Sequence, residues 1–348
     1  MKFNKLILII LIVFFGTGNV FSENSIFDVN NIKIEKLPKL TNEQLANLAI
    51  KNGFEELKKK ILLDGDTKKL SILNLSQIKE LVSYYQMSYK SEETDETDII
   101  HYNISFDKDK LHKLFYKQGI SYSEILKKEL FLLPILKKNN KIFIYNKNFF
   151  YENWNEVYNN ELIEFILPLE NIEIIQKINL NKNNLLNLSL NDLFKEYLKK
   201  NVVLILIEDN NLKEEKIFFK AKIQGKNIIK NIVLKRQNLN QDQFYEKIII
   251  ATKKNLINTI KSQNLIDIRT PSFLNAKLVI TKNSNLVELN SRLKKNDLIE
   301  NIYVQEFNNE SIFLKIKYLG KLDKIIRQLE EQKIILKLIE DQWSIKII

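Results

Sequence analysis

Imidazole and thiol side chains, which bind transition metals and serve in nucleophilic catalysis, are scarce in this sequence. The chain contains 2 histidines and no cysteine. His101 falls in a predicted strand and His112 in the helix after it, and no His-x-x-x-His or His-Glu-x-x-His spacing is present. We therefore interpret both histidines as packing or surface residues and assign no metal ligand.

An acidic run is the other candidate for cation binding. Its carboxylates belong to Glu92, Glu93, Asp95, Glu96 and Asp98. Calcium favours clustered carboxylates, but the run lacks the Asp-x-Asp-x-Asp-Gly loop with a distant Glu. We predict a solvent-exposed turn between two strands.

Patterns for covalent catalysis and phosphate binding are missing. There is no Gly-x-Ser-x-Gly elbow, and no two glycines beyond residue 22 stand at the close spacing of a phosphate-binding loop. Aromatic residues recur at helical spacing in Phe149, Phe150, Tyr151 and Trp154, which favours a core over a ligand platform. The sequence therefore assigns no catalytic residue, no cofactor-binding residue and no cofactor.

The charge of the chain, +11, raises the question of nucleic-acid binding. Arginine, whose planar fork suits phosphates and base edges, occurs only at Arg236, Arg269, Arg292 and Arg327. The lysines are scattered and interleaved with Asp and Glu, which is typical of a solvated surface. We predict no nucleic-acid partner, while weak attraction to an anionic membrane surface remains compatible with the charge.

The first predicted domain, over residues 23–122, is a small α+β domain. Thr41 and Gln44 form a capping box for a helix that Asp64-Gly65 is expected to end. Asp107 caps another helix that ends at Gly119. A shorter helix is expected over 76–82, and strands over 26–37, 84–90 and 99–106.

Residues 123–270 are predicted to form a mixed-sheet α/β domain. Val202 to Ile207 is a continuous apolar run of the kind found in a buried central strand. Gly225 is expected to turn between two strands, and a long helix follows over 241–263. Further strands are expected over 130–136, 142–145 and 162–167, and helices over 149–158 and from Ser189 to Leu198.

Residues 271–348 follow the order βαββαβ, which predicts a ferredoxin-like domain. Strands are expected over 277–281, 299–307 and 312–318, and helices over 286–293 and 322–329. The last segment, 335–347, fits either one strand or a hairpin. The fold class predicted for the whole chain is therefore α+β, in three domains.

Residues 1–22 have the form of an export signal. Lys2 and Lys5 precede the apolar run from Leu6 to Phe15, and Val20 and Ser22 fit a cleavage site after Ser22. The apolar run is about half the ~20 residues that span a bilayer. We expect a periplasmic protein without a stable membrane anchor; the alternative is an uncleaved signal-anchor in the inner membrane.

Several segments resemble an exported bacterial family known as domain of unknown function 2066. They are 61–65, 84–106, Leu133-Pro134 with Trp154, 165–169, and 193–207. The middle region is more distantly similar to the amino-terminal domain of the Tol periplasmic translocation protein, and the layout is similar to a flagellar-ring accessory protein. These resemblances imply envelope assembly or scaffolding and no catalytic residue.

Together these patterns predict an exported, non-enzymatic binding or scaffolding protein. Its expected partners are other envelope proteins or cell-wall components, and the sequence leaves the oligomeric state open. The alternative is an exported hydrolase whose carboxylates come together only in the folded chain.

Overall fold

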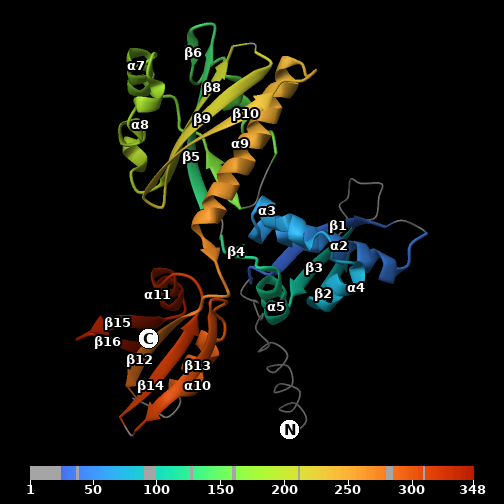
Figure 1. Ribbon diagram of the computed structural model, residues 1–348, viewed down its shortest axis with the longest axis vertical. Helices are drawn as coiled ribbons and strands as arrows, with labels where there is room; N and C mark the ends of the chain where they lie inside the picture. Colours follow the sequence, from blue (N-terminus) through green and yellow to red (C-terminus); the bar gives the residue numbers. More distant parts are fainter. Residues whose placement is uncertain are drawn as a thin grey trace, which may run out of the picture. The chain divides into compact units, whose positions relative to one another are not determined.

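The computed structural model describes residues 25–36, 39–89, 99–125, 128–158, 162–210, 212–279, 285–308 and 310–348. The expected export signal and the acidic run of residues 92–98 lie outside these ranges. Helices and strands are mixed in both of the two compact units, which confirms the α+β class (Figure 1). Unit 1 joins the chain up to Tyr122 with Ile266–Ile348, and unit 2 is Ser123–Leu265.

The first segment of unit 1 is an antiparallel sheet in the order β1-β3-β2, with helices α2 to α5. Its strands are β1 (Asp28–Glu35), β2 (Val82–Tyr89) and β3 (Ile99–Phe106). Its helices are α2 (Asn42–Ile61), α3 (Asp64–Thr67), α4 (Leu75–Glu80) and α5 (Lys108–Gln118), with a 3-10 turn η1 (Lys68–Leu70).

Local capping signals explain where the helices of this segment begin. The capping box of Thr41 and Gln44 is formed at the start of α2, as predicted. Asp107 caps α5, and Gly119 ends it with a φ of 61°. The prediction that Asp64-Gly65 ends the first long helix was wrong: α2 ends at Ile61, and Asp64 opens the short helix α3 after an extended Leu63.

The second segment of unit 1 is a five-stranded sheet in the order β13-β14-β12-β16-β15. Its elements are β12 (Ser272–Val279), α10 (Asn285–Leu293), β13 (Ile299–Phe307), β14 (Ser311–Tyr318), α11 (Leu322–Glu331), β15 (Ile334–Ile339) and β16 (Gln342–Ile347). From β12 to β15 these follow the order βαββαβ. The hairpin of β15 and β16 then places a fifth strand beside β12, parallel to it, which a plain βαββαβ plait lacks.

The two segments of unit 1 share one hydrophobic cluster. Buried residues from both segments belong to it, including Phe27, Ile104, Leu298 and Leu314. Polar contacts also link the segments, among them the hydrogen bond of 3.0 Å between the Ser25 hydroxyl and Asp297. The regions 23–122 and 271–348, which the sequence treats as separate domains, thus belong to one compact unit.

Unit 2 is built on a six-stranded mixed sheet. Its strands are β5 (Lys128–Lys138), β6 (Lys141–Phe143), β7 (Ile163–Ile166), β8 (Asn201–Asp209), β9 (Glu214–Ile223) and β10 (Lys226–Lys235). The order is β10-β9-β8-β5-β6, with β7 also paired to β5. Strand β5 runs parallel to β7 and β8, whereas β9 runs antiparallel to both of its neighbours, β8 and β10.

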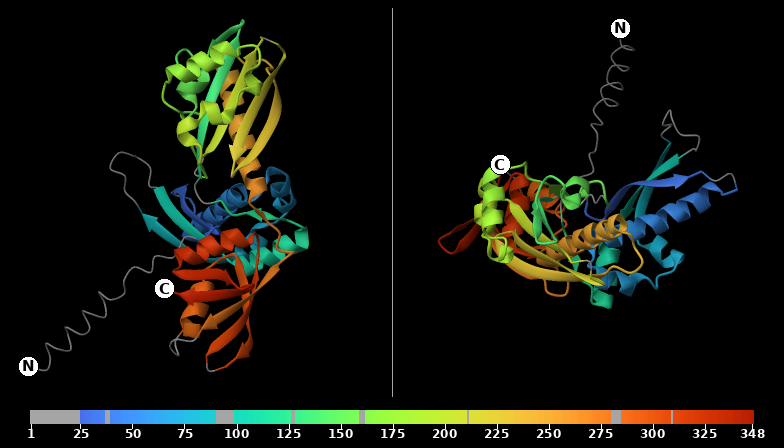
Figure 2. Two further views of the ribbon diagram at one scale, coloured as in Figure 1. Left: turned by 90° about the vertical axis from the view of Figure 1, so that its left-hand side faces the viewer. Right: turned by 90° about the horizontal axis from the view of Figure 1, so that it is seen from above.

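Helices cover both faces of this sheet. They are α6 (Phe149–Asn153), α7 (Ile172–Leu180), α8 (Leu190–Leu193) and α9 (Gln241–Gln263), with 3-10 turns η2 (Leu185–Asn187) and η3 (Lys195–Tyr197). Helix α9 lies on one face, and α7 and α8 lie on the other (Figures 1 and 2). Two separate apolar cores result, and β8 contributes to both, as its continuous apolar run predicts.

Two short strands, β4 (Tyr122–Ser123) and β11 (Leu265–Ile266), pair with each other where the chain leaves and re-enters unit 1. None of the helices in the described ranges combines the length and the apolar character that crossing a membrane requires.

Two helix predictions in unit 2 need correction. Helix α6 ends at Asn153 rather than at residue 158. The helix expected from Ser189 to Leu198 is two short turns, because Phe194 leaves helical geometry (φ −117°, ψ 42°) and packs in the core beside Leu193. Helix α7 was not predicted, although Asn171 caps its first turn.

Candidate functional site

The two histidines lie in unit 1 and bind different partners. His101 on β3 is buried and its Nδ1 lies 2.5 Å from the Asn31 side-chain oxygen. His112 on α5 stacks on Tyr122, and its Nδ1 lies 3.0 Å from Glu300. The hydrogen bond with His112 holds the pKa of Glu300 below its ordinary value, against the opposing effect of desolvation.

These histidines do not form a metal centre in the part of the chain that the structure describes. No group of three or more His, Asp or Glu side chains there is arranged to hold a metal ion. The contact between His112 and Glu300 instead links α5 to β13, so its role is to join the two segments of unit 1.

The aromatic residues around α6 belong to the interior of unit 2. Phe150 and Trp154 are fully buried, in agreement with their helical spacing. Tyr151 donates a hydrogen bond of 2.8 Å to the Pro168 carbonyl oxygen. This group therefore packs against the sheet.

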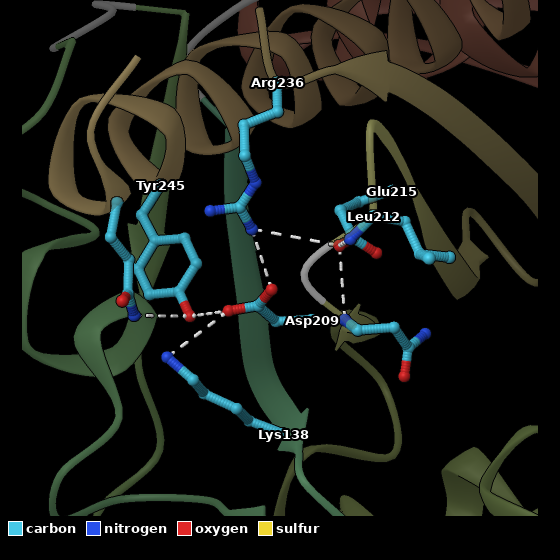
Figure 3. A network of polar contacts seen from close by, with 8 residues as sticks. Lys138, Asp209, Leu212, Glu215, Arg236 and Tyr245 are labelled. Carbon is cyan, nitrogen blue, oxygen red and sulfur yellow. Dashed lines mark hydrogen bonds and ion pairs between the residues drawn. The ribbon is translucent and has the colours of Figure 1, made fainter. Parts of the chain in front are cut away.

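A network of buried polar contacts lies at the carboxyl ends of β5 and β8 in unit 2, and the sequence did not predict it (Figure 3). Arg236 donates to one oxygen of Asp209 at 2.8 Å, and the Tyr245 hydroxyl donates to the other at 2.5 Å. The Lys138 ammonium lies 3.5 Å from Asp209, and Arg236 lies 3.8 Å from Glu215. Asp209 and Glu215 are each 1% exposed.

Neighbouring backbone groups and an aromatic ring contact the charged side chains of this cluster. Glu215 accepts hydrogen bonds from the backbone N–H groups of Asn210 and Leu212, so it fixes the turn between β8 and β9. The Arg236 guanidinium lies 4.7 Å from the centre of the Phe244 ring. Burial and the hydrogen bond to Asp209 raise the pKa of Tyr245, which keeps its hydroxyl protonated as a donor.

These contacts favour a structural role for the cluster. A hydrolase of the carboxylate type needs two carboxyl groups that reach substrate in a cleft. Asp209 and Glu215 are paired through Arg236 but are buried, and their oxygens bind groups of the protein itself. The sequence holds a weak signal for this cluster, because Asp209 is the last residue of the buried strand β8 and Arg236 directly follows β10.

Most of the β9–β10 hairpin is basic. Residues 216–235 contain six lysines and neither Asp nor Glu. Lys216, Phe218, Lys220 and Lys222 alternate with the residues of β9 that face α9, so they lie on the opposite face of the sheet. The interleaving of charges expected for the whole chain is absent from residues 216–235, although Glu214 and Glu215 begin β9.

The outer strand of this hairpin is open. Strand β10 is at the end of the sheet order, and no described strand pairs with its other side. Ile229 and Val233 are 66% and 48% exposed. An exposed edge with apolar side chains is a surface that invites pairing with another chain.

Unit 1 carries an apolar groove of about 490 Å³ between α2 and α4. It is lined by Leu40, Gln44, Asn47, Leu48, Lys51, Leu73, Asn74, Leu75 and Ile78. Lys51 is the charged group of this lining, and the rest is apolar or amide. The groove therefore suits an apolar contact better than acid–base chemistry.

Comparison with known proteins identifies no family. No family model matches the chain, and no curated protein matches it. One solved structure, described as the crystal structure of an uncharacterized protein, is 10% identical, covers 40% of this chain and 94% of its own, and has a TM-score of 0.17. Similarity at that level informs neither the fold nor the function of this chain.

Proposed function

We propose that this chain is a non-enzymatic binding or scaffolding protein of the bacterial cell envelope. The observation that carries the proposal is the contrast between its interior and its surface. The Asp209 cluster is buried and paired within the protein, whereas open sheet edges and the groove beside α2 offer surfaces for contact. Such surfaces favour association over chemistry.

Exposed edge strands recur in both units. On β2 the exposed side chains include Tyr84, Tyr85, Met87 and Tyr89, and on β13 they include Tyr303, Val304 and Phe307. Aromatic residues at open edges supply large contact areas with few rotatable bonds. We infer that the partners are other envelope proteins or cell-wall components that meet such strands.

Export is the second part of the proposal. The apolar run from Leu6 to Phe15 behind Lys2 and Lys5 supports secretion with cleavage after Ser22. The resemblance of segments such as 84–106 and 165–169 to an exported family supports the same location. The mature protein is then a periplasmic protein that begins at Glu23.

In-cell photocrosslinking of the tagged full chain tests both parts. A photoreactive residue is placed at Met87 on β2, Asn231 on β10 or Tyr303 on β13, with the exposed Lys59 of α2 as the matched control. We expect a periplasmic protein that starts at Glu23 and crosslinks specific neighbours from at least one strand position, and not from Lys59. The absence of neighbours at all three strands would contradict the binding role. If the purified protein turned over a substrate reproducibly, and substitution of the polar residues of one cleft abolished that activity, the protein would be an enzyme and the binding proposal would be wrong.

A further inference from the structure

The turn of the β9–β10 hairpin determines which backbone groups of β10 point outward. Gln224 and Gly225 both have positive φ, 50° and 78°, as a two-residue type I′ turn requires. Ile223 and Lys226 pair across this turn, so the even-numbered residues of β10 bond to β9. The N–H and C=O groups of the odd-numbered residues therefore point away from the sheet.

Two contacts at the far end of β10 agree with this register. The Lys235 carbonyl oxygen, which is odd-numbered, accepts a hydrogen bond of 3.1 Å from the Lys247 ammonium outside the sheet. The N–H of Arg236, which is even-numbered, donates to the Lys213 carbonyl oxygen at 2.9 Å. The odd-numbered groups from Asn227 to Val233 form an open row that matches a strand.

The side chains of the same odd-numbered residues lie on the face of the sheet opposite α9. Ile229 and Val233 expose apolar surface there and alternate with Asn227 and Asn231. Their counterparts on β9 are basic: Lys220 pairs with Ile229, Lys216 with Val233, and Lys222 with Asn227. An added strand would therefore meet apolar side chains with ammonium groups one strand behind them, within the reach of long acidic side chains.

On this face Lys235 forms an ion pair with Glu214 at 3.5 Å, whereas Lys220 and Lys222 contact uncharged groups. The Lys220 ammonium donates to the carbonyl oxygens of Leu186 and Leu188, and that of Lys222 donates to the Asn191 side chain. These acceptors are neutral. The face is therefore complementary to carboxylates.

We propose that β10 binds an extended acidic segment of a partner polypeptide, which adds to the sheet as a further strand. This inference rests on the proposed binding function and names its partner class. The open N–H and C=O row binds the partner's backbone, Ile229 and Val233 contact its apolar side chains, and the lysines of the hairpin bind its carboxylates.

A polypeptide fits this surface better than a polyanion or a membrane. Phosphate recognition favours arginine, and Arg236, the arginine that follows β10, is turned inward to Asp209. A lipid headgroup layer would leave the backbone row of β10 without the regular partners that a strand supplies. These two alternatives are outcomes of the test below.

Fluorescence anisotropy with the full mature chain measures binding of a labelled, acetylated peptide of alternating Glu and Val. A peptide of alternating Lys and Val is the control. We expect binding of the acidic peptide that weakens as salt is added, because surface ion pairs are screened. Ile229→Pro removes an outward N–H and leaves the β9 ladder intact, so it should weaken binding at least tenfold; Ile229→Thr should weaken it far less.

Variants that change the charge of the lysines measure the ionic contribution to peptide binding. Lys216→Glu with Lys222→Glu should weaken binding of the acidic peptide more than tenfold and reduce its salt dependence. The double change Lys216→Gln with Lys222→Gln should give an intermediate loss. Exchange of Lys59 on α2 for Glu is the matched surface control and should leave binding unchanged.

Amide hydrogen exchange tests the proposal on the unaltered protein, so the result does not depend on whether a variant folds. On addition of the acidic peptide, the amides of Asn227, Ile229, Asn231 and Val233 should become protected, while their even-numbered neighbours are already protected in the free protein. Lack of peptide binding, or binding without this alternation, would overturn strand addition. Binding of a DNA oligonucleotide or of phosphatidylglycerol vesicles with the odd amides unprotected would assign the surface to a polyanion or a membrane instead.

The outcomes distinguish this inference from the function on which it rests. Specific crosslinks from Met87 or Tyr303, with no peptide bound at β10, would overturn the acidic-strand site and leave the binding role in place. Peptide binding at β10 without any crosslinked neighbour in cells would support the site and contradict the role in the envelope.

Discussion

Asp209 holds the ends of several elements together through one carboxylate. It binds Lys138 at the end of β5, Arg236 after β10 and Tyr245 on α9. With Glu215 included, the cluster contains two acidic and two basic side chains, so its formal charges balance. Buried charges are tolerated when they are paired in this way, but removal of one partner leaves an uncompensated charge.

The first prediction concerns this carboxylate. Asp209→Asn should lower the free energy of unfolding of unit 2 by about 3–5 kcal/mol, because Arg236 and Lys138 lose their counter-charge in a buried site. Urea unfolding followed by Trp154 fluorescence in a Trp343→Phe background reports on unit 2, since each unit contains one of the 2 tryptophans.

The neighbouring residue on β8 supplies the control for that prediction. Glu208 points to the opposite face, where it pairs with Lys137 at 3.2 Å and is partly exposed. Glu208→Gln should cost no more than about 1 kcal/mol, as is usual for pairs near solvent. Equal losses for the two variants would show that the Asp209 cluster is not a buried anchor.

The second prediction is a pH dependence that arises from Lys253 on α9. Its ammonium donates to the carbonyl oxygens of Val157 and Tyr158 at 2.7 and 3.0 Å, and burial lowers its pKa from 10.5 to about 8. Because the folded pKa is below the unfolded one, unfolding takes up a proton between these values, so the stability contributed by this group increases as the pH rises from about 8 to 10.5.

Lys253→Met should lack this rise, while Lys254→Met on the exposed neighbour should keep it. The measurement is the difference in urea midpoint between each variant and the parent at several pH values across the window. Parallel curves for the parent and Lys253→Met would rule out a buried Lys253 that changes its protonation on unfolding.

At the scale of elements, local signals determined which parts could be predicted. The bounds of α9 follow from its apolar stripe and agree with the sequence prediction. Helix α7 was missed because its β-branched isoleucines resemble a strand and its Asn171 cap stands alone. The Asp209 cluster was missed because its members come from β5, β8, β9, α9 and the residue after β10, which meet only through the order of the strands.

The third prediction tests the packing of α2 on β3. A Cβ added at Gly53 would lie 2.7 Å from the Ile104 Cδ1 atom, which is buried. Gly53→Ala should therefore destabilise unit 1 by about 1 kcal/mol, because overpacking of about 1–3 kcal/mol exceeds the gain in helix propensity. Ile104→Val removes the clashing methyl, so the double variant should be more stable than Gly53→Ala alone.

Urea unfolding followed by Trp343 fluorescence in a Trp154→Phe background measures this coupling in unit 1. The sum of the single effects of Gly53→Ala and Ile104→Val is the reference. If the double variant loses as much free energy of unfolding as this sum, the two side chains do not compete for the same space.

At the scale of the whole molecule, the chain builds unit 1 from two separated segments. Residues far apart in sequence meet there, such as His112 and Glu300, which are 188 positions apart. Sequence periodicity describes neighbours along the chain, so each segment was interpreted as a domain with its own core. The shared core became visible only when the sheet and helix faces of both segments were in place.

The last prediction follows from this arrangement. Because β4 and β11 pair where the chain crosses between the units, the ends at Tyr122 and Ile266 lie close enough for a short linker. Replacement of residues 123–265 by a Gly-Ser linker should therefore give a protein that unfolds cooperatively in urea, followed by the fluorescence of Trp343. Residues 123–265 alone should also fold, since both of their apolar cores lie within that range.

The isolated segments of unit 1 serve as controls for that prediction. Residues 25–122 without 266–348 would expose the apolar side chains that the shared cluster buries, so this fragment should bind a hydrophobic dye and unfold at a lower urea concentration than the linked protein. Equal stability of fragment and linked protein would mean that each segment folds on its own core. In that case the contacts of His112 with Glu300 and of Ser25 with Asp297 would join two independent domains.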